Sequence, residues 1–184
     1  MKIIGVTGMR GSGKSVVSEV AQKMGIPSIE MRTVVTEMMK KQGIPINNRS
    51  LRDFATDIRK EYGYDVVAKK TIEELETLSK FKASTVIVDG VRSKQEVDLF
   101  KKKFGRNFIL IAMFAPQKLR FTRVQGRRKG DDPATWEEFL WADEKEKNWG
   151  VLEAISQADY VVVNTRSREE VVRQVRDILG KVMD

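Results

Sequence analysis

Gly8-Met9-Arg10-Gly11-Ser12-Gly13-Lys14-Ser15 matches in full the pattern G-x-x-x-x-G-K-[ST] of a phosphate-binding loop. An apolar run at 2–6 precedes it and an apolar-striped segment at 14–24 follows it, so the loop joins a predicted strand to a predicted helix. This context favours the motif over a chance match, because the loop N–H groups and the helix N-terminus surround the phosphates together. The sequence therefore predicts a nucleoside-triphosphate site formed by all eight residues.

Two residues of this loop carry specific chemistry. The Lys14 ammonium can reach the β- and γ-phosphates, which makes it a candidate catalytic residue. The Ser15 hydroxyl is a candidate Mg²⁺ ligand. The chain has no N-K-x-D segment of the kind that reads a guanine base, so we expect ATP and Mg²⁺ as the cofactors.

The composition excludes several classes of site. With no cysteine there are no disulfides and no thiolate metal centre, and with no histidine there is no histidine-based hydrolytic triad. Phosphoryl transfer needs neither residue, because positioning and charge neutralisation supply most of its catalysis. No apolar stretch is long enough to span a membrane, and Met1-Lys2 leads directly into the first predicted strand, which leaves no room for a signal peptide. We expect a cytoplasmic protein with no membrane partner; nothing in the sequence indicates an oligomeric state.

The chain is basic, with a net charge of +8, and residues 117–130 contain no acidic side chain. Such a balance indicates either a solvated basic surface or a partner that carries phosphates, a nucleotide or a nucleic acid. Within this stretch Arg120, Arg123 and Arg127 recur at i, i+3 and i+7, which places them on one face of a predicted helix. We expect this stripe to face an anionic ligand; a merely solvated face is the alternative.

Apolar and β-branched runs predict five strands, which alternate with helical patterns. The strands are predicted at 2–6, 26–29, 85–88, 108–114 and 160–163. This alternation is typical of a parallel sheet covered on both faces. The sequence therefore predicts an α/β fold of three α/β/α layers around a central parallel five-stranded sheet, built as one domain over residues 1–184.

The helical pattern is longest at 31–80, where it exceeds an ordinary crossover between strands. It predicts helices at 31–42, 50–62 and 65–78, the second of them capped by Ser50 and Asp53. Further capping boxes are predicted from the pairs Ser93 with Glu96, Thr135 with Glu138, and Ser167 with Glu170.

Asp89 and Arg92 follow the apolar strand at 85–88. Ligands of open α/β sheets bind at the carboxyl ends of the strands, so Asp89 is a candidate for holding Mg²⁺ through water; a turn residue is the alternative. Arg92 could clamp a phosphate bidentately or could be an ordinary surface arginine. Trp136, Trp141 and Trp149 lie on one predicted helix, where packing is favoured over base stacking.

These motifs together resemble the nucleoside-monophosphate-kinase group of P-loop NTPases, of which adenylate kinase is the familiar member. The resemblance extends along almost the whole chain. It rests on the loop 8–15, the helical segment 31–80, the turn Asp89-Gly90-Val91-Arg92, the run Arg123-Val124-Gln125-Gly126-Arg127-Arg128, which is similar to the R-x-x-G-R-R start of an adenylate kinase lid, and the ending Val163-Asn164-Thr165. Within the group the chain looks most like archaeal adenylate-kinase-related or dephospho-CoA-kinase-like proteins, through the stretches 4–8, 88–93 and 131–133.

The resemblance implies a kinase that transfers the γ-phosphate of ATP to a nucleotide-like acceptor. AMP or another nucleoside monophosphate is the first candidate acceptor and dephospho-CoA the second. The segment at about 31–80 would bind the acceptor and a short lid at about 124–135 would close over the site. Arg92, Arg123 and Arg127 would act in catalysis with Lys14; Arg123 and Asn164 would contact ATP; and Arg32, Arg59 and Arg92 would contact the acceptor.

Two departures keep another class of function open. Adenylate kinases carry G-D-x-x-R where this chain has Arg32-Thr33-Val34-Val35-Thr36, and the later paired arginines of their lid have no match here. A nucleotide-binding regulator or an RNA-associated ATPase is therefore the alternative, which the net positive charge of the chain also favours.

Overall fold

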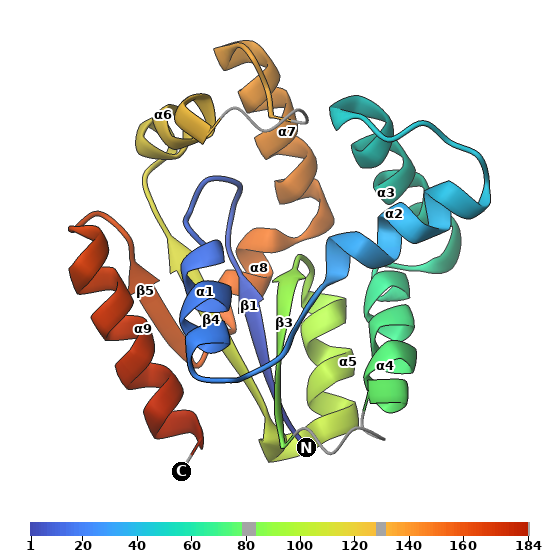
Figure 1. Ribbon diagram of the computed structural model, residues 1–184. Helices are drawn as coiled ribbons and strands as arrows, with labels where there is room; N and C mark the ends of the chain where they lie inside the picture. The colour runs from blue at the N-terminus through green and yellow to red at the C-terminus, as the bar shows by residue number, and fades with distance from the viewer. Residues whose placement is uncertain (79–83, 128–131, 184) are drawn as a thin grey trace.

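A parallel sheet of five strands forms the centre of the molecule in the computed structural model, which describes residues 1–78, 84–127 and 132–183 (Figure 1). The strands are β1 (Lys2–Thr7), β2 (Ser28–Glu30), β3 (Thr85–Val91), β4 (Phe108–Phe114) and β5 (Tyr160–Val163). Their spatial order is β2-β3-β1-β4-β5, and every neighbouring pair is parallel. The fold class predicted from the sequence is confirmed. Because all the strands run in the same direction, their carboxyl ends lie at one end of the sheet, where the loop 8–15 begins.

Side chains alternate between two buried clusters, one on each face of the sheet. On one face Ile4 and Ile111 contact helices α1 (Ser15–Lys23) and α9 (Arg168–Met183). On the other face Ile3 and Leu110 contact α5 (Lys94–Phe104) and α8 (Val151–Ser156). Strands with two buried faces explain the continuous apolar runs of the sequence, since neither side of the sheet meets water.

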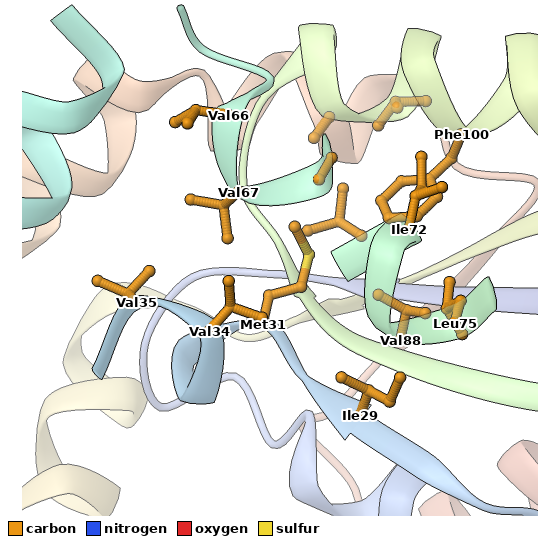
Figure 2. Close-up of a cluster of buried hydrophobic side chains, with 14 of the residues drawn as sticks. Ile29, Met31, Val34, Val35, Val66, Val67, Ile72, Leu75, Val88 and Phe100 are labelled. Atoms are coloured by element: carbon orange, nitrogen blue, oxygen red, sulfur yellow. The ribbon is translucent and has the colours of Figure 1, made fainter. Parts of the chain in front are cut away.

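The long helical segment forms three helices beside β3. They are α2 (Met31–Lys41), α3 (Asn48–Tyr62) and α4 (Val66–Leu78). Figure 2 shows how α2 and α4 join the main core: Met31 and Val34 of α2 lie beside Val67 of α4, close to Val88 of the sheet and Phe100 of α5. The segment is therefore part of the main core and forms a wall beside the carboxyl end of β3.

Two local expectations need correction. The second strand begins at Ser28 rather than at residue 26. The cap of α3 is Asn47 rather than Ser50: the Asn47 Oδ1 accepts from the N–H groups of Arg49 and Ser50, at 2.9 Å each. Ser50 instead occupies the third helical position, and its Oγ accepts from the Asn47 N–H at 3.0 Å. An asparagine, which caps as well as serine, thus starts the helix one turn earlier.

The remaining helices, α6 (Gln117–Arg127) and α7 (Trp136–Trp149), lie above the carboxyl edge of the sheet in Figure 1. The left-handed Gly150, at φ +99°, ends α7 after Trp149 and starts the separate short helix α8, which the sequence patterns did not predict. A short 3₁₀ turn, η2 (Gly105–Asn107), leads into β4 at the opposite edge. None of the helices in the described part of the chain is long and apolar enough to cross a membrane.

Candidate active site

The loop 8–15 turns sharply between β1 and α1 and is held against the ends of two other strands. Gly8 and Gly13 have φ angles of +142° and +96°, which side chains rarely adopt. A Cβ at Gly8 would collide with the carbonyl oxygen of Met113, and one at Gly13 would collide with the side-chain amide of Asn164. The chain therefore needs glycine at these positions for close backbone packing as well as for its dihedral angles.

The Lys14 ammonium lies folded back into the loop. Its Nζ donates to the carbonyl oxygens of Gly8, at 2.5 Å, and Met9, at 3.1 Å. Burial lowers the pKa of Lys14 to about 8, and the nearby Arg92 lowers it further, against the opposing effect of Glu146 and Asp89. A triphosphate placed beside this amine would favour its charged form, so ligand binding and protonation of Lys14 are coupled.

A cavity of about 440 Å³ opens next to the loop. Its wall combines the loop with the carboxyl ends of β2 and β3 and with parts of α2, α3, α4, α6 and α7. The predicted site residues that line it are Arg10, Gly11, Gly13, Lys14, Ser15, Arg32, Arg59, Asp89, Arg92 and Arg127. The structure thus brings the predicted phosphate loop and the predicted acceptor side into one hollow.

Asp89 and Ser15 face this cavity from opposite elements, and their chemistry fits Mg²⁺. Among the described residues the buried Asp89 Oδ1 has no hydrogen-bond partner, and burial raises the pKa of Asp89 while Lys14 and Arg92 oppose the rise. An unpartnered buried oxygen is costly unless a ligand or water reaches it. The described residues hold no cluster of three acidic side chains for a metal ion. A P-loop site needs none, because nucleotide oxygens supply much of the coordination.

Asp89→Asn should raise the Mg²⁺ concentration needed for half-maximal ADP formation by about tenfold, because the variant keeps the shape of the side chain and loses its charge. The melting temperature should not fall, since burial disfavours the charged form of this group. Asp98→Asn, an exposed change on α5, is the matched control. A magnesium titration of Asp89→Asn that superimposes on wild type would leave Asp89 as a turn residue.

Glu146 is a central residue of the cavity that the sequence patterns did not identify. It is 2% exposed. Its Oε2 accepts from the backbone N–H of Arg10 at 2.9 Å, and its Oε1 forms an ion pair with the Arg92 Nη1, also at 2.9 Å. Burial alone would raise the pKa of Glu146, but Arg92, Lys14 and Arg10 hold it at about 2. This carboxylate is therefore charged throughout the physiological pH range.

A signal for Glu146 exists in the sequence. Phe139 and Ala142 mark the buried face of α7, and Asp143, Glu146 and Trp149 continue it at helical spacing. Two acids on the apolar face of a helix are unusual, because a buried carboxylate requires a cationic partner. Both have one here: Glu146 pairs with Arg92, and Asp143 pairs with Arg120.

Four arginines of the cavity, among them Arg92, are paired with carboxylates of the protein itself. Arg59 pairs with the buried Glu96 at 3.0 Å, and Arg10 and Arg127 pair with Asp132 at 2.7 and 2.6 Å. Glu96 also accepts from the Arg92 backbone N–H at 2.6 Å, so this carboxylate fixes the turn after β3 and does not complete the capping box predicted with Ser93. The local excess of positive charge is thus smaller than the composition of the site implies.

The expectation of one ligand-facing arginine stripe on α6 is wrong for Arg120. This residue is 5% exposed. Its Nη1 donates to Asp143 at 2.7 Å and to the Arg10 carbonyl at 2.9 Å, and its Nη2 donates to the second Asp143 oxygen. Helix α7 packs against this face of α6 and supplies Asp143. Arg120 therefore joins α6, α7 and the phosphate loop.

Arg123 and Asn164 are brought together beside the phosphate loop. The Arg123 Nη2 donates to both the carbonyl and the side-chain oxygen of Asn164, at 3.0 and 3.1 Å. The Asn164 amide in turn donates to the Ser12 carbonyl at 2.9 Å. Neither residue lines the large cavity. The two form a bridge from α6 through the end of β5 to the loop, on the side where ATP contacts were expected.

The three tryptophans have separate surroundings. Trp136 packs against Phe121 and Phe139, as expected for a packing residue. Trp141 lies beneath the Lys145 ammonium. Trp149 differs, because it lines the cavity and the Arg59 guanidinium lies over its ring, 4.8 Å from the ring centroid.

The lid predicted at about 124–135 falls partly outside the described residues, which omit 128–131 and with them Arg128 and Asp131. On either side, α6 ends at Arg127 and α7 begins at Trp136. The Gln125 side-chain amide links the end of α6 to the residues before α7, because it donates to the carbonyls of Pro133 and Ala134, at 3.0 and 2.9 Å.

Comparison with known proteins identifies relatives along the whole chain. A family model described as an AAA domain matches residues 4–146. A UPF0200 protein of Thermococcus onnurineus is 38% identical over 182 residues, which cover 98% of each chain. A UPF0200/UPF0201 protein of Archaeoglobus fulgidus is 40% identical over 99% of this chain, but the match spans only 56% of that relative.

Solved structures of similar fold include kinases. A shikimate kinase from Bacteroides thetaiotaomicron superimposes with a TM-score of 0.61 at 15% identity, over 97% of this chain and 98% of that one. A dephospho-CoA kinase from Campylobacter jejuni gives a TM-score of 0.58 at 15% identity, over 98% and 96%. Identities this low establish a shared fold and leave the substrate of this chain to its own residues.

Proposed function

The chain belongs to the UPF0200 family and carries an AAA domain of the P-loop kinase-like fold, and from this premise we propose that it transfers the γ-phosphate of ATP to a small nucleotide-like acceptor. The observation that carries the proposal is the cavity, in which the phosphate loop faces a wall of arginine and apolar side chains. A nucleotide switch or ATPase would need only the loop half of this hollow.

The wall opposite the loop suits a phosphate-bearing molecule with a flat or apolar body. Arg32, Arg52 and Arg59 line it together with Val35, Leu51, Ala55, Val67 and Trp149. Guanidinium groups bind phosphate bidentately, and an aromatic ring and small aliphatic side chains accept a nucleobase. AMP or another nucleoside monophosphate is the first acceptor to test, and dephospho-CoA is the second.

Each residue of the site has a role in such a transfer. The loop N–H groups and the α1 N-terminus bind the triphosphate, and Lys14 neutralises charge on the γ-phosphate as it moves. Ser15 and, through water, Asp89 would hold Mg²⁺, which when bound shields the phosphate charges. Arg123 and Asn164 fix the loop from the α6 side, and Arg127, at the end of α6, approaches the cavity from the lid.

Arg92→Ala tests the acceptor side. Calorimetry with a non-hydrolysable ATP analogue already bound should show AMP binding to the wild-type protein. The variant should weaken AMP by about tenfold and the analogue by less, since one hydrogen bond to a charged group contributes about 1.5–3 kcal/mol. Arg106→Ala, at the opposite edge of the sheet, is the matched control.

The outcomes of this titration separate the candidate functions. Binding of dephospho-CoA without AMP would move the acceptor to the second candidate. If the protein binds neither molecule but binds RNA, with an affinity that falls steeply as salt rises, the phosphotransferase proposal is wrong and the RNA-associated ATPase takes its place.

A further inference from the structure

Glu146 differs from the other carboxylates that line the cavity. Glu30 is exposed at the end of β2, Glu19 pairs with Arg168 on the outer surface, and Asp89 is proposed for Mg²⁺. Glu146 alone among these four is only 2% exposed with a contact on each oxygen: Oε2 accepts from the Arg10 N–H, and Oε1 forms an ion pair with the Arg92 Nη1. The Arg10 N–H belongs to the phosphate loop itself, so this negative charge lies directly beside the loop.

A carboxylate has about four acceptor positions; the hydrogen bond from the Arg10 N–H uses one of them, and the Arg92 Nη1 lies 2.9 Å from Oε1 as an ion pair. The remaining positions can accept a hydrogen bond from a ligand in the cavity. A neutral hydroxyl group can donate that bond, and a hydrogen bond to an ionised carboxylate is among the stronger kinds. A phosphate monoester has mostly lost its second proton near neutral pH, so its oxygens have no proton to donate. Its negative charge would also repel Glu146.

Arg92 supports the same distinction. Its Nη1 forms an ion pair with Glu146, so this guanidinium is held beside the carboxylate on the acceptor side of the cavity. Glu96 holds the backbone of Arg92 from the other side. Arg92 is thereby positioned to orient the Glu146 carboxylate, while the arginines of α2 and α3 remain close to the far wall of the cavity, where an anionic part of the acceptor would bind.

We infer that the group which receives the γ-phosphate is a hydroxyl and that Glu146 is the catalytic residue that binds it; this inference rests on the proposed function. The hydroxyl oxygen forms a bond to the γ-phosphorus as the bond from that phosphorus to the β–γ bridging oxygen breaks. ADP leaves with the electron pair of the broken bond. The hydroxyl donates a hydrogen bond to the Glu146 carboxylate, which orients it, and its proton is released to solvent as the ester forms, so that ATP and an alcohol give ADP, a phosphate monoester and a proton.

Glu146→Gln tests this assignment with water as the hydroxyl nucleophile and ATP as the only substrate. The variant should form ADP with a kcat about 10²-fold lower, because the charged acceptor that orients the nucleophile is lost. A non-hydrolysable ATP analogue should bind at least as tightly as to wild type, because one negative charge beside the triphosphate has been removed. Turnover and affinity should therefore change in opposite directions, which a purely structural residue would not produce.

Asp143→Asn is the matched control, since it removes the same charge one turn earlier on α7 from an equally buried ion pair outside the cavity. It should lower the melting temperature without separating turnover from affinity. Unchanged or faster ADP formation by Glu146→Gln would overturn the inference, and so would a parallel loss of binding and turnover. Conversion of AMP to ADP by the wild-type protein would also overturn it, because the receiving group would then be a phosphate.

The proposed function fails by a different result. Absence of analogue binding to the wild-type protein would refute ATP use altogether. Analogue binding by the wild-type protein with no ADP formation, with or without an acceptor, would refute phosphoryl transfer, whereas ADP formation that Glu146→Gln leaves unchanged overturns only the role of Glu146.

Discussion

Lys14→Ala should slow ADP formation by about 10²–10³-fold, the loss that follows removal of one preorganised electrostatic contact to a transition state. The ammonium is already held by hydrogen bonds to the Gly8 and Met9 carbonyls, so little reorganisation is needed when charge builds on the transferring phosphate. The fold should tolerate the change, because burial disfavours this charge in the nucleotide-free protein, as its lowered pKa of about 8 shows. Initial rates at saturating ATP and a thermal melt measure the two effects.

Lys23→Ala, an exposed change at the end of the same helix, controls for a general effect on α1. An ADP formation rate within threefold of wild type in Lys14→Ala would remove the loop from catalysis. A fall in melting temperature that accounts for the lost activity would make Lys14 a structural residue.

Arg120→Met should lower the free energy of unfolding by about 3–5 kcal/mol, since it leaves the Asp143 carboxylate buried without its cation. For a chain of this size such a change lowers the melting temperature by about 10 °C or more. Urea denaturation followed by circular dichroism measures the loss directly. The side chain also donates to the Arg10 carbonyl, so the phosphate loop should lose part of its support.

The double variant Arg120→Met with Asp143→Leu distinguishes the cost of an unpaired buried charge from the cost of changing the side chains at these positions. Replacing both charges with apolar groups of similar volume is often neutral for stability, so most of the loss should be recovered. A single variant as stable as wild type would show that water or another cation reaches Asp143, and the packing of α6 on α7 would then depend on the aromatic contacts alone.

The sheet and the phosphate loop could be predicted because their signals are local. A β-branched run such as Val86-Ile87-Val88 specifies a buried strand wherever it occurs, and the loop motif contains its own dihedral requirements. Most of the helix-capping residues could also be predicted, because the signal of a cap lies within the first turn of its helix. The exception, Asn47, was missed because the box it forms with Ser50 lacks the Ser/Thr and Glu pair of the common pattern.

The electrostatics of the site could not be predicted in this way. Arg92 and Glu146 are 54 positions apart, and Arg120 and Asp143 are 23 apart, so each pair exists only through the packing of one helix on another element. From spacing alone the three arginines of α6 share one face. Once α7 packs against that helix, Arg120 is buried, Arg123 contacts Asn164, and Arg127 pairs with Asp132.

The position of Trp149 gives the protein an optical probe of its acceptor side. Its indole lines the cavity beneath Arg59, and the ring nitrogen donates to the Thr56 hydroxyl at 3.0 Å. Indole emission depends on nearby charge and polarity, so a ligand that draws Arg59 away from the ring changes the fluorescence of Trp149. With Trp136 and Trp141 replaced by phenylalanine, Trp149 would be the only tryptophan, and its fluorescence would report ligand binding in the acceptor half of the cavity. The phosphate loop has no aromatic residue and would contribute no fluorescence.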